Sequence, residues 1–217
     1  MNAGELLDLF RTEVVDTVVP YLWSDDFILS TISDAQVQFA RHTDGIPDST
    51  TDAVTLIELV ASTGVYALHD KVLKIRSAYR TDTGRAIDML NVEDMAPRKM
   101  YFDGREGTTT ALITGMDENS VRAYPVPAEA FDIRLSTFRL PLVAITDGDD
   151  PLVVPDQHQR PLLMWMKHLA YGVHDTEAFD RTKSEEFAQA FKAYCASAKV
   201  DQGRARHKPR AVAYGGL

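Results

Sequence analysis

The spacing of apolar residues changes twice along the chain, and no other sequence feature constrains the fold as strongly. Residues 1–50 and 151–202 have the helical spacing of three to four, whereas residues 51–150 tend to alternate apolar with polar side chains. An amphipathic helix cannot bury its apolar face alone, so the two outer regions are predicted to pack against each other. The middle region, residues 51–150, is then a β-sheet domain inserted between them.

Two helices are predicted near the N-terminus. The first carries apolar residues at every fourth position and is closed by Pro20, which cannot continue a helix. The second begins after Ser24 or Asp25, because either side chain can accept hydrogen bonds from free backbone amides. It ends in the turn that contains Gly45 and Pro47.

Two further helices are predicted after Pro155, and they have the clearest periodicity in the sequence. The last one starts near Asp175, a plausible cap, and ends at Gly203. Their apolar stripes are the candidate packing surfaces, either within the bundle or between subunits. The residues on these stripes are Leu162, Trp165, Met166 and Leu169 on the third helix, and Phe187, Phe191 and Tyr194 on the fourth.

Two segments of the middle region alternate without a break, as expected of strands with one face in water. They are Val72–Arg76 and Phe131–Ser136, with weaker candidates at Leu56–Val60, Gly64–Leu68, Thr109–Thr114 and Val121–Tyr124. The predicted fold class is therefore α+β: a four-helix bundle formed by the N- and C-terminal helices, an inserted antiparallel β-sheet domain and an extended C-terminal arm.

The C-terminal arm, residues 203–217, is basic, although the chain as a whole has a net charge of −9. It has no helical or strand period, so we expect it to become ordered only when a partner supplies a surface. Its arginines suit carboxylate pairing, and Tyr214 is the strongest candidate anchor. The candidate docking residues are Arg204, Arg206, Lys208, Arg210, Val212, Tyr214 and Leu217. A solvated terminus without function is the alternative.

No sequence feature indicates catalysis or a cofactor. The sequence has no glycine-rich phosphate loop after a strand, no nucleophile elbow and no zinc-ligand spacing. Asp147–Asp150 places three carboxylates around a glycine and could hold calcium, but the further ligands are lacking, so a solvated turn is the preferred interpretation. The histidines are interpreted as surface or helix-end residues. We expect a protein that is not an enzyme and has no metal or cofactor.

Composition and sequence pattern also argue against several other classes of protein. No apolar run is long enough to cross a membrane, and the N-terminus does not resemble a signal peptide, so a soluble protein is expected. The excess of acids argues against wrapping nucleic acid by phosphate neutralisation. The single cysteine, Cys195, excludes an intrachain disulfide framework.

Several local strings, together with the order of elements, resemble the head-to-tail adaptor proteins of tailed bacteriophages, also called head completion or connector proteins. In short-tailed phages the same class is called tail tubular protein A. The strings that carry the resemblance are Trp23–Phe27 before a helix, Tyr124–Pro127 before the strand Phe131–Leu135, Arg139–Leu142, Val154–His158 before an apolar helix, and the final helix Asp180–Tyr194. The likeness extends from about Trp23 to Ala198.

The resemblance implies a structural virion protein in the neck, made in the host cytoplasm. Such proteins form a homo-oligomeric ring, here of about twelve subunits, that joins the portal protein to a tail or nozzle protein. DNA passes through the channel without specific binding, and an acidic wall would repel its phosphates. The C-terminal arm is implied to dock into the portal.

Two other functions remain open from the sequence. The basic arm could contact DNA phosphates directly, in which case affinity must fall steeply with salt. An enzyme with a site in the Asp147–Asp150 loop is the third hypothesis, although nothing in the sequence brings further acids there.

Overall fold

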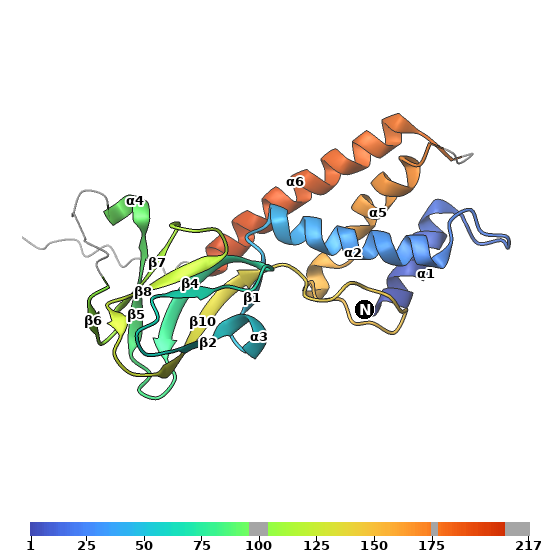
Figure 1. Ribbon diagram of the computed structural model, residues 1–217. Coiled ribbons are helices and arrows are strands. Elements are labelled where there is room, and N and C mark those ends of the chain that lie inside the picture. The colour runs from blue at the N-terminus through green and yellow to red at the C-terminus, as the bar shows by residue number, and fades with distance from the viewer. Residues whose placement is uncertain (96–103, 175–177, 207–217) are drawn as a thin grey trace, which may run out of the picture. The chain divides into compact units, whose positions relative to one another are not determined.

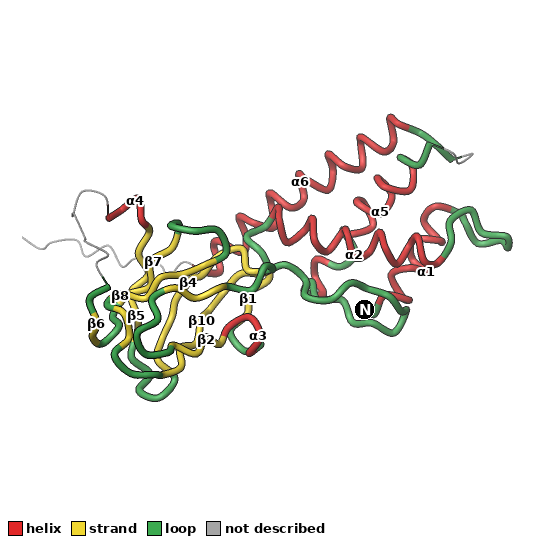
Figure 2. The backbone as a smooth tube through the Cα atoms, in the orientation of Figure 1, coloured by secondary structure: helices red, strands yellow, loops and turns green. Residues whose placement is uncertain are grey.

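A computed structural model describes residues 1–95, 104–174 and 178–206. The chain divides into two compact units, shown as ribbon and tube in Figures 1 and 2. The first, called the helical unit, comprises Met1–Asp44 and the described part of Val143–Leu217. The second, called the sheet unit, is Gly45–Leu142. The sheet unit is therefore one continuous insertion in the sequence of the helical unit.

Local sequence signals set the ends of the helices in the helical unit. The helices are α1 (Ala3–Val14), α2 (Asp25–His42), α5 (Leu162–Tyr171), α6 (Arg181–Arg206) and the short 3-10 helix η2 (Asp156–His158). The Ser24 hydroxyl accepts a hydrogen bond from the Phe27 amide at 3.3 Å, which confirms Ser24 as the cap of α2. The Asp180 carboxylate accepts from the Lys183 amide at 3.1 Å, so α6 begins later than the predicted start. The predicted cap, Asp175, lies outside the described residues.

The predicted end of the last helix at Gly203 is wrong, because α6 continues through this residue to Arg206. A glycine inside a helix costs only about 1 kcal/mol relative to alanine. The Arg204 guanidinium also pairs with the Asp201 carboxylate at 3.2 Å, one helical turn earlier. Such pairs support a helix. The first residues assigned to the arm are therefore helical.

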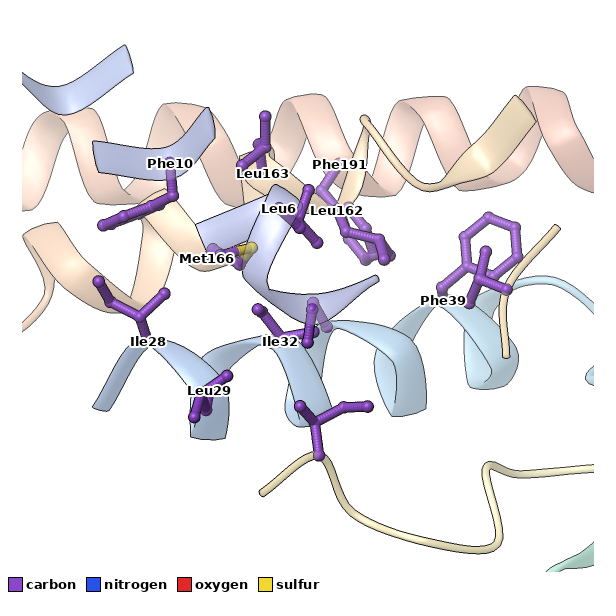
Figure 3. Packing of buried hydrophobic residues seen from close by; sticks show 14 of the residues in the cluster. Leu6, Phe10, Ile28, Leu29, Ile32, Phe39, Leu162, Leu163, Met166 and Phe191 are labelled. Carbon is purple, nitrogen blue, oxygen red and sulfur yellow. The ribbon is translucent and has the colours of Figure 1, made fainter. Parts of the chain in front are cut away.

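The helical unit has one continuous apolar core. Figure 3 shows Leu6 and Phe10 of α1 and Ile32 of α2 directed toward Met166 of α5 and Phe191 of α6. All five side chains are almost completely buried. At about 25 cal/mol per Å² of apolar surface, burial of such side chains is the main force that holds the helices together.

The sheet unit contains a large curled sheet and a two-stranded sheet (Figure 1). The large sheet has the order β1-β10-β4-β5-β7-β8-β3, and β2 also pairs with β10. Its strands are β1 (Ile46–Asp48), β2 (Leu56–Leu59), β3 (Val65–Ala67), β4 (Val72–Arg80), β5 (Ala86–Asn91), β7 (Ala111–Thr114), β8 (Ser120–Tyr124) and β10 (Phe131–Arg139). The small sheet pairs β6 (Glu106–Gly107) with β9 (Val126–Pro127), and the short helices are α3 (Asp52–Thr55) and α4 (Val92–Met95).

The predicted fold class is wrong in both of its main parts. The large sheet is mixed, because β5 and β7 pair in parallel, and the small sheet is parallel. Parallel neighbours need a crossover connection, which short alternating segments do not reveal. The helices do not form a four-helix bundle, in which four helices would run about 20° from parallel or antiparallel around one core. Instead the 10-residue helix α5 lies at the centre and packs against α1, α2 and the 26-residue helix α6.

Strands β4 and β5 separate soon after the turn that joins them. They pair only at Ala78 with Ile87 and at Tyr79 with Ala86. Beyond that point β4 continues along β10, whereas β5 turns to β7. A hollow of about 420 Å³ opens where the two strands diverge. The divergence gives the large sheet its curl.

A buried ion pair joins the first and last strands of the sheet unit. The Arg139 guanidinium on β10 binds the Asp48 carboxylate on β1, whose other oxygen accepts from the Thr50 and Thr51 amides at 3.0 Å each. Burial opposes the charge on Asp48, but these amides and Arg139 together outweigh it and hold the pKa of Asp48 well below its ordinary value. The pair fixes the register of β1 on β10.

Candidate contact surface

The loop between α1 and α2 exposes most of its apolar side chains. Val15, Val18 and Val19 are 82%, 76% and 74% exposed, and Tyr21 and Leu22 are also exposed. Residues 15–22, called the apolar loop, extend beyond the ends of both helices in Figure 1. Single exposed apolar residues are ordinary, but a cluster of five in one short loop is typical of a contact surface.

A buried ion network holds the base of the apolar loop rigid. The Arg11 guanidinium donates to the Asp16 carboxylate at 2.7 Å, to the Trp23 carbonyl at 2.9 Å and to Asp25. Asp16 in turn accepts from the Leu22 amide at 2.8 Å. The side chains of Arg11 and Asp16 are each only 7% exposed. Hydrogen bonds to charged groups in a buried site are strong, so the two ends of the loop are held together without a partner.

Two further features characterise the apolar loop. The Arg11 guanidinium on α1 lies 3.7 Å from the centre of the Tyr21 ring, a cation–π contact between the helix and the loop. Val15 ends α1 in the left-handed conformation, with a φ of 60°. Glycine is the usual residue there, because the left-handed conformation costs a side-chain-bearing residue about 1–2 kcal/mol. Because Val15 is exposed and strained and adds nothing to the core, it is a candidate contact residue.

The helical unit also has an apolar groove of about 490 Å³ over α5 and α6. This groove, called the α5–α6 groove, is lined by Gln157, Pro161, Leu163, Met164, Phe187 and Tyr194 and by the charged residues Glu13, Arg160 and Lys167. Leu163 forms a buried floor, whereas Met164, Phe187 and Tyr194 are half-buried. The Tyr194 hydroxyl is held by the His158 ring at 2.8 Å, so this wall of the groove has a fixed position.

Charged side chains border the α5–α6 groove. Glu13 accepts from the Lys167 ammonium at 2.6 Å, and this hydrogen bond, against the opposing effect of burial, lowers the pKa of Glu13. Arg160 reaches Glu13 only at 3.5 Å, and its side chain is 74% exposed. The border therefore presents one cation that is only loosely engaged.

The candidate packing residues fall into two groups. Leu162, Met166 and Phe191 are buried in the core of the helical unit, and Trp165 packs against it while donating to the Asp34 carboxylate at 2.6 Å. Phe187 and Tyr194 line the α5–α6 groove, and Leu169 lines a second groove between α2 and α5. Phe187 and Tyr194 are therefore available to a neighbouring molecule.

Of the candidate docking residues of the arm, the structure describes only the first two, Arg204 and Arg206. Arg204 lies on α6 with a side chain that is 78% exposed, and Arg206 is the last residue of that helix. Lys208, Arg210, Val212, Tyr214 and Leu217 lie outside the described residues. Docking by the arm stays a prediction.

The Asp147–Asp150 turn uses its polar groups internally. The Asp150 carboxylate accepts from the Thr146 and Asp147 amides, which lowers the pKa of Asp150. The turn also accepts the Gly4 amide at the start of α1, through the Gly148 carbonyl at 2.7 Å. It therefore anchors the N-terminus.

The described histidines of the C-terminal helices have structural partners. His158 lies between Phe39 and Tyr194, and burial lowers the pKa of its ring. His168 contacts Ser184 at the start of α6. Among residues 1–95, 104–174 and 178–206, no group of His, Cys, Asp or Glu side chains could hold a metal ion. None of the described helices is long and apolar enough to cross a membrane.

Sequence reasoning missed the apolar loop. In the sequence, Val18-Val19-Pro20 indicates only the end of a helix. These valines are exposed because the Arg11 hydrogen bonds fix the base of the loop, and the sequence does not reveal those bonds. The one available signal was a set of apolar residues after α1 that continued no helical stripe.

Comparison with known proteins gives a family for the chain. No curated protein matches it. The SU10 adaptor protein family, in contrast, matches residues 1–213, which is nearly the whole chain and includes both units. The likeness to phage adaptor proteins seen in the sequence is thereby confirmed, and the chain belongs to the SU10 adaptor protein family.

Proposed function

We propose that this phage adaptor is a subunit of a homo-oligomeric ring that joins the portal to the tail and continues the DNA channel. The observation that carries the proposal is family membership over residues 1–213. The helical unit adds support, because it combines a rigid exposed apolar loop with an apolar groove. Surfaces of this kind are typical of chains that function in an assembly.

The ring is tested by mixing the full chain with the portal protein of the same phage. We expect a closed ring with cyclic symmetry, of about twelve copies as the resemblance to phage head-to-tail adaptors implies, bound to one end of the portal in electron micrographs. A chain that remains a monomer and ignores the portal would contradict the proposal. The assembly would place the protein in the neck of the virion.

We further propose that residues 207–217 dock into the portal. The support is their charge, which is opposite to that of the acidic chain, and the exposed Arg204 at the end of α6 that leads into them. Removal of residues 207–217 leaves every described element intact, so the truncated chain should fold but lose portal binding. Normal assembly of the truncated chain would show that the arm is not the tether.

DNA contact by the basic arm is the second candidate, favoured only by its arginines and lysine. Titration of a labelled duplex at two salt concentrations separates the two functions. Binding through several phosphates weakens steeply with salt. We expect no such binding, because the net charge of −9 repels DNA, and the same repulsion would let a genome slide through the channel.

A further inference from the structure

We propose that the apolar loop of one copy docks into the α5–α6 groove of the next copy, and that this contact builds the ring. The inference rests on the proposed function and names the surface through which subunits would join. The loop supplies exposed aliphatic side chains on a rigid base, and the groove supplies half-buried apolar walls. Both lie on the helical unit, so every copy carries one of each.

A contact between two different surfaces determines the kind of assembly. When the loop of one copy fills the groove of the next, each added copy still has a free loop at one end and a free groove at the other. Such a head-to-tail contact closes into a ring if the rotation between copies permits. A loop-to-loop contact would instead stop at a dimer.

Charge complements shape at this contact. Asp26 lies in the first turn of α2, shortly after the apolar loop, and is exposed, whereas its neighbour Asp25 is already bound to Arg11. On the groove, Arg160 is exposed and only loosely bound to Glu13. A loop seated in the groove can bring these opposite charges together at its border, which favours the correct orientation and faster association.

The same acids argue against a membrane as the partner of the loop. Apolar loops that enter a bilayer surface are usually flanked by lysine and arginine, which bind anionic lipids. Here the first charged residues after the loop are the acids Asp25 and Asp26, and the chain carries a net charge of −9. A protein surface with an exposed cation is the better match.

The first test compares two exposed valines in the full chain. Val18→Asp places a charge in the loop, and Val143→Asp is the control, because Val143 is 77% exposed but lies elsewhere on the helical unit. We expect Val18→Asp to weaken self-association by about tenfold or more, as for a central contact residue, and Val143→Asp to leave it unchanged. Equal effects of both variants, or of neither, would overturn the proposal.

The second test identifies the two surfaces directly. Chains with Val18→Cys and chains with Met164→Cys are mixed under mild oxidation. We expect disulfide-linked pairs in the mixture and not in either variant alone. Native Cys195 does not interfere, because it is buried and its thiol has a pKa of about 12. Cross-linking of Val18→Cys with itself would show a loop-to-loop contact and overturn the proposal.

A charge exchange completes the design. Arg160→Glu and Asp26→Arg should each weaken association, and a mixture of the two variants should restore it, because opposite charges meet again across one border. Failure of the mixture to recover would remove the border contact from the proposal.

If Val18→Asp still forms rings on the portal, the loop-to-groove contact fails while the adaptor function stands. If the unmodified chain forms no ring at all, the adaptor function itself fails.

Discussion

Each unit contains a buried arginine–aspartate pair, and the two pairs serve different purposes. In the helical unit, Arg11 and Asp16 are each 7% exposed and shape a loop whose apolar side chains face water. In the sheet unit, Arg139 and Asp48 are 11% and 4% exposed and align the first strand with the last. A buried ion pair adds little net stability compared with an apolar replacement, and in this chain each pair holds a particular segment in place. One pair therefore specifies a surface, and the other specifies a sheet.

The largest expected effect on stability follows from the removal of the Arg11 guanidinium. Arg11→Met leaves the Asp16 carboxylate buried without a cation, which should lower the free energy of unfolding of the helical unit by about 3–5 kcal/mol. Both tryptophans, Trp23 and Trp165, lie in this unit, so tryptophan fluorescence during urea unfolding reports on it alone. An unchanged urea midpoint would show that the network does not hold the loop.

A smaller loss of stability is expected when the Arg139–Asp48 pair of the sheet unit is broken. Asp48→Asn removes the charge opposite Arg139 but keeps an oxygen for the Thr50 and Thr51 amides. We expect a cost of about 2–3 kcal/mol, below that of a fully broken buried pair. Hydrogen exchange of the β1 and β10 amides should rise, while protection of α5 and α6 should change little. Equal loss of protection in both units would contradict independent roles for the pairs.

Acid should weaken the sheet unit through the same group. The pKa of Asp48 is lowered in the folded state, so the unfolded state binds its proton first as the pH falls. The stabilisation is complete above the ordinary aspartate pKa of about 3.9 and is lost as the pH falls through the folded-state pKa. Exchange of the β1 and β10 amides at about pH 5 and about pH 3 should differ more in the unmodified chain than in Asp48→Asn. An equal difference would assign the acid sensitivity to other groups.

The smallest expected effect on stability comes from Val15→Gly, which should change folding stability and self-association in opposite directions. Val15→Gly relieves about 1–2 kcal/mol of left-handed strain, offset by the greater flexibility of glycine when unfolded, so stability should rise by about 1 kcal/mol or less. Self-association should weaken, because one exposed apolar side chain is lost from the loop. A fall in both quantities would mean that Val15 supports the fold rather than the contact.

The structure of the helical unit could be predicted from the sequence more completely than that of the sheet unit. Caps and apolar spacing are local signals, so α1, α2 and α5 could be predicted from residues such as Ser24 and from the stripe of Leu162 and Met166. The end of α6 could not, because the cost of Gly203 is small enough for a helix to continue.

The pairing of strands depends on contacts distant in sequence. Strand β5 carries Asp88 and Asn91 among its apolar residues and gave no alternating signal, and its parallel pairing with β7 depends on a crossover. Strand β1 contains Pro47, a turn signal, and is placed by the ion pair of Asp48 with a residue far along the chain. The apolar loop was missed for the same reason, since exposure is a property of the folded unit.

Electron microscopy of the chain mixed with its portal protein is the most direct test of the adaptor function. We predict a ring of about twelve copies, as cyclic symmetry allows, seated coaxially on one end of the portal, and neighbouring copies in contact through the apolar loop. Isolated monomers beside an unoccupied portal would contradict the function assigned to this chain.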